Sequence, residues 1–297
     1  MRRQPVTGLV PHGAGHQFVF YGDCCSGIPG KPYEINFARV NAVLQQLKPP
    51  PEFILFLGDH IAGAAGDANT IRGQWRHWLG TEMTWLDSDR IPVYHVTSNH
   101  DTPDLNAETV WREVFPDLPR NGPPGQEGLS YWVRREDLLL VIVNTSFSGL
   151  GGDGHVECSW LDATLDAQAD ASYKIVAGHY PVFPVNGYGE RPLWCIDKAE
   201  AEAFWSVLIR HGVLAYLCSH IIAFDVQEHS GVLQICSGGA GTNSGPGGFM
   251  GEGEYHHFVQ AALDADEFRL QTVDPENRVR ERLARSSGTQ SPGGQEC

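Results

Sequence analysis

Five apolar segments of the chain each end in a side chain that can bind a metal ion. In the clearest case, the run from Phe53 to Leu57 leads through Gly58 into Asp59. A short, uninterrupted apolar run is typical of a strand buried on both faces, and such strands deliver functional groups from their carboxyl ends. The other four segments end in Asp23, in Asn99 with His100 and Asp101, in His179, and in His220. Together the five endings indicate one shared site.

These side chains suit a transition metal. Carboxylate and amide groups supply hard oxygen ligands and imidazole supplies nitrogen, a combination that zinc, manganese and iron accept. The candidate ligands are tens of residues apart in the sequence. That spacing argues against a zinc finger, and it fits strand–helix units that each contribute one ligand at the same edge of a sheet.

An alternation of strands and helices must position these residues. A strand at 18–21, a helix at 34–47 and the strand at 53–57 form a βαβ unit. The same reasoning predicts strands at 91–97, 174–177 and 213–217, and helices around Trp75, around Trp111, at 160–167 and at 199–210. Paired strands are expected at 129–143, 224–236 and 256–273, and the first of these pairs begins a second sheet.

Length, composition and charge narrow the class of protein. The chain has 297 residues, 41% of them hydrophobic, and its strand-like runs are evenly distributed. We therefore expect one α/β domain at 17–280, with a flexible N-terminal arm at 1–16 and a disordered tail at 281–297. The formal net charge of −15 argues against nucleic acid or an anionic membrane surface as a partner. No feature of the sequence indicates the oligomeric state.

The cysteines and the N-terminus predict a cytoplasmic location. There are seven cysteines, an odd number without the spacing of a disulfide framework. No signal-peptide core follows Met1, and no apolar run approaches the roughly 18 residues that span a membrane.

The motifs resemble those of the calcineurin-like metallophosphoesterases, and most closely those of the purple acid phosphatases. That family has an early aspartate, Gly-Asp, Gly-Asn-His-Asp/Glu, Gly-His and Gly-His-x-His in this order. The corresponding residues here are Gly22-Asp23, Gly58-Asp59, Ser98-Asn99-His100-Asp101, Gly178-His179 and Ser219-His220-Ile221-Ile222. The resemblance covers roughly residues 17 to 273 and implies a four-layer α/β/β/α sandwich of two mixed sheets.

The resemblance also implies a function and residue roles. The function is hydrolysis of a phosphate ester by a metal-activated water, with a small phosphorylated molecule as substrate. Asp59 would bridge two metal ions, and Asn99, His179 and His220 would complete one of the two sites. Asp23 would belong to the other site, and His100 would act as general acid or transition-state stabiliser.

The chain departs from the family pattern on one side only. Ile222 stands where the last histidine of Gly-His-x-His is expected, and Ala62 stands where purple acid phosphatases have a tyrosine ligand. We therefore expect one firmly bound Fe, Zn or Mn ion, divalent or trivalent, and leave open a second ion with substitute ligands. Cys25 is the nearest substitute, followed by His60, Asp225, His256 and His257.

Two other readings of the sequence remain open at this stage. One is a mononuclear metallohydrolase that acts on a bond other than a phosphate ester, because half of the usual binuclear ligand set is missing. The other is a metal-binding module without catalytic activity. The presence of His100 weighs against the second reading, since a non-catalytic site does not need that side chain.

Overall fold

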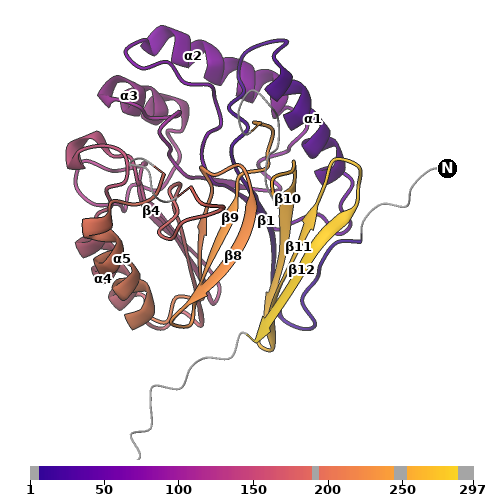
Figure 1. The fold of residues 1–297 in the computed structure, drawn as a ribbon, viewed down its shortest axis with the longest axis vertical. Helices are drawn as coiled ribbons and strands as arrows, with labels where there is room; N and C mark the ends of the chain where they lie inside the picture. Colours follow the sequence, from indigo (N-terminus) through magenta and orange to yellow (C-terminus); the bar gives the residue numbers. More distant parts are fainter. Residues whose placement is uncertain (1–6, 189–193, 244–252, 287–297) are drawn as a thin grey trace, which may run out of the picture.

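Two six-stranded mixed sheets face each other, and helices cover the outer face of each (Figure 1). The computed structural model describes residues 7–188, 194–243 and 253–286. The first sheet contains β1 (Gly15–Tyr21), β2 (Phe53–Phe56), β3 (Val93–His95), β10 (Phe258–Asp264), β11 (Glu267–Val273) and β12 (Val279–Ser286), in the order β12-β11-β10-β1-β2-β3. The second contains β4 (Tyr131–Arg135), β5 (Leu138–Ile142), β6 (Tyr173–Ala177), β7 (Ala215–Cys218), β8 (Phe224–His229) and β9 (Val232–Ser237), in the order β4-β5-β6-β7-β9-β8.

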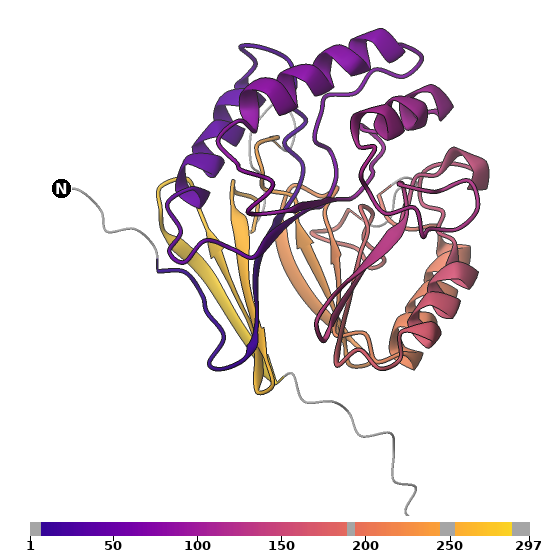
Figure 2. The same ribbon diagram turned by 180° about the vertical axis from the view of Figure 1, so that it is seen from behind.

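The helices divide between the two outer faces. The helical elements are α1 (Pro32–Leu44), α2 (Ala68–His77), the π-helical turn η1 (Trp78–Glu82), α3 (Leu105–Val114), the 3₁₀ turn η2 (Ser148–Leu150), α4 (Cys158–Ala167) and α5 (Lys198–Arg210). The view from behind in Figure 2 shows α1, α2 and α3 with the first sheet and α4 and α5 with the second. This is the four-layer arrangement that the sequence resemblance implied.

Alternating side chains of the central strands point to opposite faces of each sheet and so belong to different hydrophobic cores. Phe18 and Phe20 of β1 belong to the core between the sheets, together with Leu138 and Leu140 of β5. Val19 packs on the other face of the first sheet, in the core beneath α1 to α3. All these side chains are buried, which explains why the strands appear in the sequence as continuous apolar runs.

Parallel pairing brings the strand ends to one edge of each sheet. In the first sheet β1, β2 and β3 are parallel, with Tyr21 opposite Phe56 and Phe56 opposite His95. In the second sheet β5, β6, β7 and β9 are parallel, with Ala177 opposite Leu217. The residues that follow these strands therefore leave the sheets side by side.

Most of the expected elements are confirmed, but the boundaries of the domain are wider than expected. The domain extends past residue 280, because β12 continues to Ser286 and pairs with β11. The expected arm is also attached from Thr7 onwards: the Gln271 side chain donates to the Thr7 carbonyl, and the His12 amide donates to Asp264. Residues 1–6 and 287–297 lie outside the described residues. Within the described part of the chain, no helix combines the length and apolarity needed to cross a bilayer.

Candidate metal centre

The residues expected to form the site come from both sheets. Asp23, Asp59 and Asn99 follow β1, β2 and β3 of the first sheet, whereas His179 and His220 follow β6 and β7 of the second. Backbone hydrogen bonds join the loops that carry them: the Asp23 amide donates to the Gly58 carbonyl, and the Ser219 amide donates to His179. The site therefore lies where the carboxyl ends of the two sets of parallel strands meet.

Four of these side chains converge on a single point. The Nε2 atom of His179 lies 3.0 Å from Asn99 Oδ1, 3.1 Å from His220 Nδ1 and 3.3 Å from Asp59 Oδ1. Potential ligand atoms of Asp59, His179 and His220 all lie within 4.8 Å of one another. His179 is fully buried and Asp59 nearly so. The structure thus brings together the complete four-residue set that the sequence resemblance implied for one metal.

The hydrogen bonds around His179 fit a metal ion. Its Nδ1 lies 2.9 Å from the Leu57 carbonyl oxygen, which can only accept, so Nδ1 carries a proton and Nε2 is the nitrogen directed at the centre. This Nε2 faces the oxygens of Asn99 and Asp59, which are acceptors. Asp59 Oδ1 is buried and has no hydrogen-bond partner among the described residues. A cation among these atoms would satisfy all of them, and the oxygen and nitrogen donors suit Zn, Mn or Fe.

Charge keeps the Asp59 carboxylate ionised. Burial alone would raise its pKa, but the positive charge of neighbouring histidines, first His179 and then His100 and His220, holds the pKa of Asp59 below its ordinary value. The Asp59 amide donates to Ser98 Oγ at 2.8 Å, and Ser98 in turn donates to Asp101. The ligand is therefore supported by a hydrogen-bonded chain behind it.

Strained backbone marks the site. Asp23, Cys25, Asp59 and His220 have φ between 42° and 66°, and they make up half of the eight non-glycine residues with positive φ among those described. Such conformations cost of order 1–3 kcal/mol each and persist where the surrounding structure fixes them. Gly58 also has a positive φ, of 97°, and cannot be replaced by a larger residue without displacing a neighbour, because a Cβ there would lie 2.7 Å from His179 Nδ1.

Asp23 contacts the backbone of one of the four converging residues and does not join their group of side chains. Its Oδ2 accepts a hydrogen bond from the His220 amide at 3.0 Å, so its carboxyl group supports the strained backbone of a ligand. Burial, and then the charge of Asp59, raises the pKa of Asp23 well above its ordinary value. Among the described residues, Asp23 belongs to no group of three potential ligands within mutual reach.

Cys25 is the expected substitute that lies nearest to the centre. Its Sγ is 3.6 Å from Asp59 Oδ2, and Cys25, Asp59 and His100 present ligand atoms within 4.8 Å of one another. Burial raises the pKa of the Cys25 thiol well above its ordinary value, and the charges of Asp59 and Asp23 raise it further. Without a metal the thiol is protonated, which makes it a weak donor to Asp59.

The other proposed substitutes have different roles. His60 is turned away from Asp59, with Nδ1 2.7 Å from Asp101 Oδ2 and Nε2 3.0 Å from His95. His257 is buried with Nδ1 2.8 Å from the Tyr255 carbonyl and Nε2 3.1 Å from Ser237 Oγ. Both rings have both nitrogens within hydrogen-bond distance of groups that are not among the converging residues, so their role as substitutes is not supported by this geometry. Asp225 accepts from Gln227, and His256 bonds to the backbone of Thr242.

His100 lies at the open side of the centre. Its Nδ1 is 2.8 Å from the Ala62 carbonyl oxygen, so this nitrogen carries a proton and Nε2 is the reactive position. Nε2 lies 4.0 Å from Asp59 Oδ2, and 40% of the side chain is exposed. The charge of Asp59 is the main cause that raises the pKa of His100 above its ordinary value. A half-exposed imidazolium next to the centre is suited to donate a proton to a bound molecule.

Three residues near the centre were not predicted from the sequence. The Tyr180 ring lies 4.2 Å from the His220 ring between centroids, and the Trp194 ring lies 5.5 Å from it. Burial raises the pKa of Tyr180 and the charge of Asp153 raises it further, and the same charge adds to the larger effect of Asp59 on the pKa of His100. Only Tyr180, which directly follows His179, had a signal in the sequence. Asp153 and Trp194 lie in loops whose path depends on tertiary contacts.

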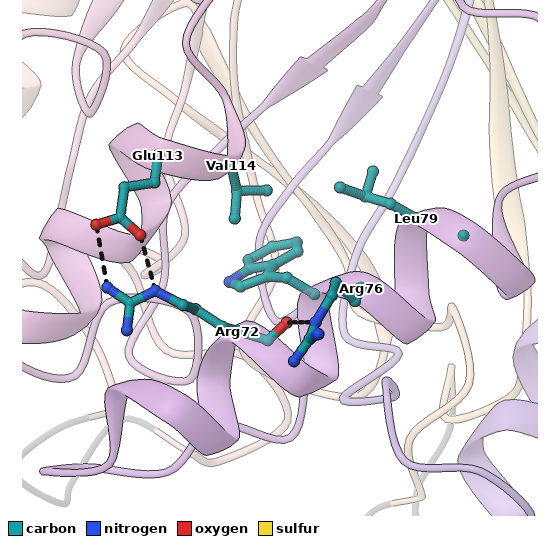
Figure 3. Close-up of a pocket in the computed structure, with 7 residues that line it drawn as sticks. Arg72, Arg76, Leu79, Glu113 and Val114 are labelled. Carbon is teal, nitrogen blue, oxygen red and sulfur yellow. Dashed lines mark hydrogen bonds and ion pairs between the residues drawn. The ribbon is translucent and has the colours of Figure 1, made fainter.

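A cavity elsewhere in the structure contains none of these residues. It has a volume of about 620 Å³, lies between α2 and α3, and is lined by Arg72, Trp75, Arg76, Leu79, Gly80, Glu113 and Val114 (Figure 3). Arg72 makes two hydrogen bonds to Glu113, at 2.8 and 3.0 Å, so its guanidinium is already paired. We assign no chemistry to this cavity.

Comparison with known proteins agrees with the geometry of the centre. Residues 16–224 match the family model described as calcineurin-like phosphoesterase. Tartrate-resistant acid phosphatase type 5 from Homo sapiens is 35% identical over 253 residues, which cover 75% of this chain and 72% of that protein. The corresponding protein from Oryctolagus cuniculus is 25% identical over 246 residues, with the same 75% and 72% coverage.

Solved structures share the fold. Purple acid phosphatase PPD1 from yellow lupin, Lupinus luteus, superposes with a TM-score of 0.68 at 12% identity, over 94% of this chain but only 55% of the lupin chain. A Plasmodium protein described as GAP50, the anchor in the inner membrane complex, superposes with a TM-score of 0.58 at 13% identity, over 92% of this chain and 89% of that one. The two-sheet sandwich is therefore common to these proteins.

Proposed function

This chain belongs to the calcineurin-like phosphoesterase family, whose chemistry is metal-dependent hydrolysis of phosphate esters, and we propose that it works with a single catalytic metal ion held by Asp59, Asn99, His179 and His220. The substrate is a small phosphorylated molecule. In this proposal Asp23 is a support for His220 rather than a ligand of a second ion. The cytoplasmic location expected from the sequence stays a prediction.

One observation carries the proposal. Nε2 of His179 faces acceptor oxygens of Asn99 and Asp59 at 3.0 and 3.3 Å, and His220 adds a second imidazole to the same buried point, a nitrogen and oxygen donor set that suits a transition-metal ion. On the opposite side of Asp59, where a second metal ion would bind, fewer side chains can serve as ligands. The positions expected to supply its histidine and tyrosine ligands hold Ile222 and Ala62, whose side chains cannot bind a metal.

The bound ion would supply Lewis acidity, which polarises the phosphoryl group and activates water at neutral pH. The protein residues do the rest. Asp59, Asn99, His179 and His220 hold the ion. His100, fixed by its Nδ1 hydrogen bond to Ala62, presents Nε2 as the proton donor for the leaving oxygen.

Hydrolysis of chromogenic phosphate monoesters and diesters tests the function. Treatment with a chelator should abolish the activity, and Zn²⁺, Mn²⁺ or Fe²⁺ should restore it in the native protein but not in His220→Ala. His155→Gln is a suitable control, because it removes an imidazole that pairs with Glu200 instead of facing the centre. Activity that survives chelation would contradict the proposal. Metal-dependent hydrolysis of other esters alone would favour a different bond as the target, and metal binding with no hydrolysis at all would indicate a binding module.

A further inference from the structure

The π-helical turn η1 changes which side chains share a face at the end of α2. The Met83 amide donates to the Trp78 carbonyl at 2.9 Å, a hydrogen bond that spans five residues. Residues five positions apart do not face each other in an α-helix, but i→i+5 bonding brings them round to the same side. As a result His77, the last residue of α2, meets Glu82, the last residue of η1, with Nε2 3.5 Å from Oε1.

Glu34 of α1 completes a group of three potential ligands. Its Oε1 lies 2.6 Å from His77 Nε2, and the ligand atoms of Glu34, His77 and Glu82 all lie within 4.8 Å of one another. The group shares no residue with the centre around Asp59. Imidazole nitrogen and carboxylate oxygen are both donor types that zinc binds, and three protein ligands leave the fourth position of a tetrahedral ion for water.

The Glu82 carboxylate is buried and incompletely satisfied. Only 4% of its side chain is exposed, and Oε1 accepts hydrogen bonds from Ser26 Oγ and the Gly27 amide, both at 2.9 Å. Oε2 has no hydrogen-bond partner in the described parts of the chain. Burial also raises the pKa of Glu82, which is the cost of keeping this group charged without a full set of partners. A cation at this position would offset that cost.

Solvent reaches the group from the side of His77 and Glu34, opposite the buried Glu82. The side chains of His77 and Glu34 are 18% and 22% exposed, so an ion can enter without a rearrangement of the core. The group also contacts the loop that follows Cys25, because Glu82 binds Ser26 and Gly27 while Glu34 accepts from the Gly30 amide. An ion here would join α1, η1 and this loop.

We propose that Glu34, His77 and Glu82 form a second, non-catalytic binding site for a divalent transition metal, with zinc as the best match and water as the fourth ligand. The site fixes the loop 26–30, which leads away from the metal centre. It is independent of the proposed catalytic function, since neither site contributes a ligand to the other. Without an ion, the same three residues would form only the contacts of His77 Nε2 with the two carboxylates.

Zinc stoichiometry distinguishes the two cases. Chelator-stripped protein is loaded with Zn²⁺, freed of excess metal by gel filtration and analysed by elemental mass spectrometry. We expect His77→Gln and Glu82→Gln to bind one equivalent less than the native chain, and His155→Gln to bind the same amount as the native chain. His155 is a matched control, because it pairs with Glu200 at the comparable distance of 2.7 Å but belongs to no group of three ligands among the described residues.

Two further variants complete the test. Glu34→Gln changes the more exposed carboxylate and carries the test if the buried Glu82 variant does not fold. His220→Ala removes the catalytic ion, so combining it with His77→Gln should remove a second equivalent and establish that the sites are separate. Equal zinc content in the native chain, His77→Gln and Glu34→Gln would overturn the proposal and leave an ion pair. If His220→Ala were the only variant to lose zinc, the catalytic centre would be the single zinc site and the proposal would likewise be overturned.

Discussion

At the scale of single residues, the centre depends on which nitrogen of each histidine is protonated. The carbonyl groups of Leu57 and Ala62 each face the Nδ1 atom of one ring, His179 and His100 respectively. Both contacts leave Nε2 directed at the site, but the two rings differ in burial. His179 is fully enclosed, as the proposed ligand role requires, whereas His100 is half exposed, as its proposed contact with a substrate requires. Burial therefore separates the ligand role from the proton-donor role.

Replacement of His100 by alanine should impair catalysis without removing the metal. Loss of a positioned general acid typically lowers kcat by about 10²- to 10⁴-fold. We expect this decrease for a substrate with a poor leaving group and a smaller one for an ester of an acidic phenol, because the latter needs less proton donation. Measurement of kcat for both substrates, with metal content determined in parallel, checks the prediction. An equal decrease for the two substrates would argue against proton donation.

Variants of Asp23 separate a supporting role from a ligand role. Asp23→Asn keeps an oxygen that accepts from the His220 amide and should retain the metal, whereas Asp23→Ala removes the acceptor. Loss of such a supporting contact typically weakens metal binding by about 10- to 100-fold. Isothermal titration of the stripped proteins with Zn²⁺ measures both affinities. If Asp23 instead bound a second ion, Asp23→Asn would already lose one equivalent.

At the scale of elements, hydrogen bonds join the two sheets at both ends. At the metal-centre end, Ser219 Oγ donates to the Leu57 carbonyl and the Gly22 amide donates to Ser237. At the opposite end, His16 of β1 lies 2.7 Å from Asp137, in the turn between β4 and β5. The first connection positions ligands from different sheets, so the geometry of the centre depends on how the sheets pack.

The His16 contacts should make stability depend on pH. The ring is 4% exposed and lies between Glu52 and Asp137; burial lowers its pKa, but the two carboxylates outweigh burial and raise the pKa above the ordinary 6.5. His16 and Glu52 line a small cavity that also contacts Arg134, Arg135 and Glu136. Because the folded-state pKa is raised, the stabilisation is complete below about pH 6.5 and is lost as the pH rises through the folded-state value.

Comparison with His16→Gln measures this contribution. We expect the native chain to be more stable than the variant by about 1 kcal/mol below pH 6, a modest value because Asp137 is half exposed and solvent screens its charge. The difference should shrink at alkaline pH. Urea unfolding of both proteins at pH 5.5 and pH 8.5 provides the test, and a difference that grows with pH would contradict it.

At the scale of the whole molecule, the sequence was sufficient for most of the fold. Apolar runs such as Phe53 to Leu57 predicted the central strands, because strands covered on both faces need apolar side chains on both. β12 was missed because its sequence, Val-Arg-Glu-Arg-Leu-Ala-Arg-Ser, lacks such a run and most of its residues are exposed. Its pairing with β11 depends on tertiary structure instead.

The candidate site was predicted in part. The five strand endings pointed to one shared site, since parallel strands bring their carboxyl ends together, and the family resemblance selected the four residues that converge. The contact between Asp23 and the His220 amide was not predictable, because it depends on how two sheets meet. The group of Glu34, His77 and Glu82 was also missed. An α-helical spacing would keep His77 and Glu82 apart, and no pattern in the sequence predicts the π-helical turn that brings them together.

Metal binding should stabilise the whole domain, because the ligands come from both sheets. An ion that binds only the folded state at 100 times its dissociation constant adds about 2.7 kcal/mol to the free energy of unfolding. Thermal unfolding of stripped protein, with and without Zn²⁺ at this excess, should show a higher midpoint with the metal. In His220→Ala the increase should be smaller, and an equal increase in both proteins would argue against a centre that joins the sheets.

The number of ions lost in each centre variant tests the central claim most directly. Metal content per chain is measured by elemental mass spectrometry on the native protein and on His220→Ala, Asp23→Asn and Cys25→Ser. A single catalytic ion predicts that His220→Ala loses one equivalent while Asp23→Asn and Cys25→Ser lose none. Loss of an equivalent in Asp23→Asn or Cys25→Ser would contradict the claim and establish a binuclear centre with substitute ligands.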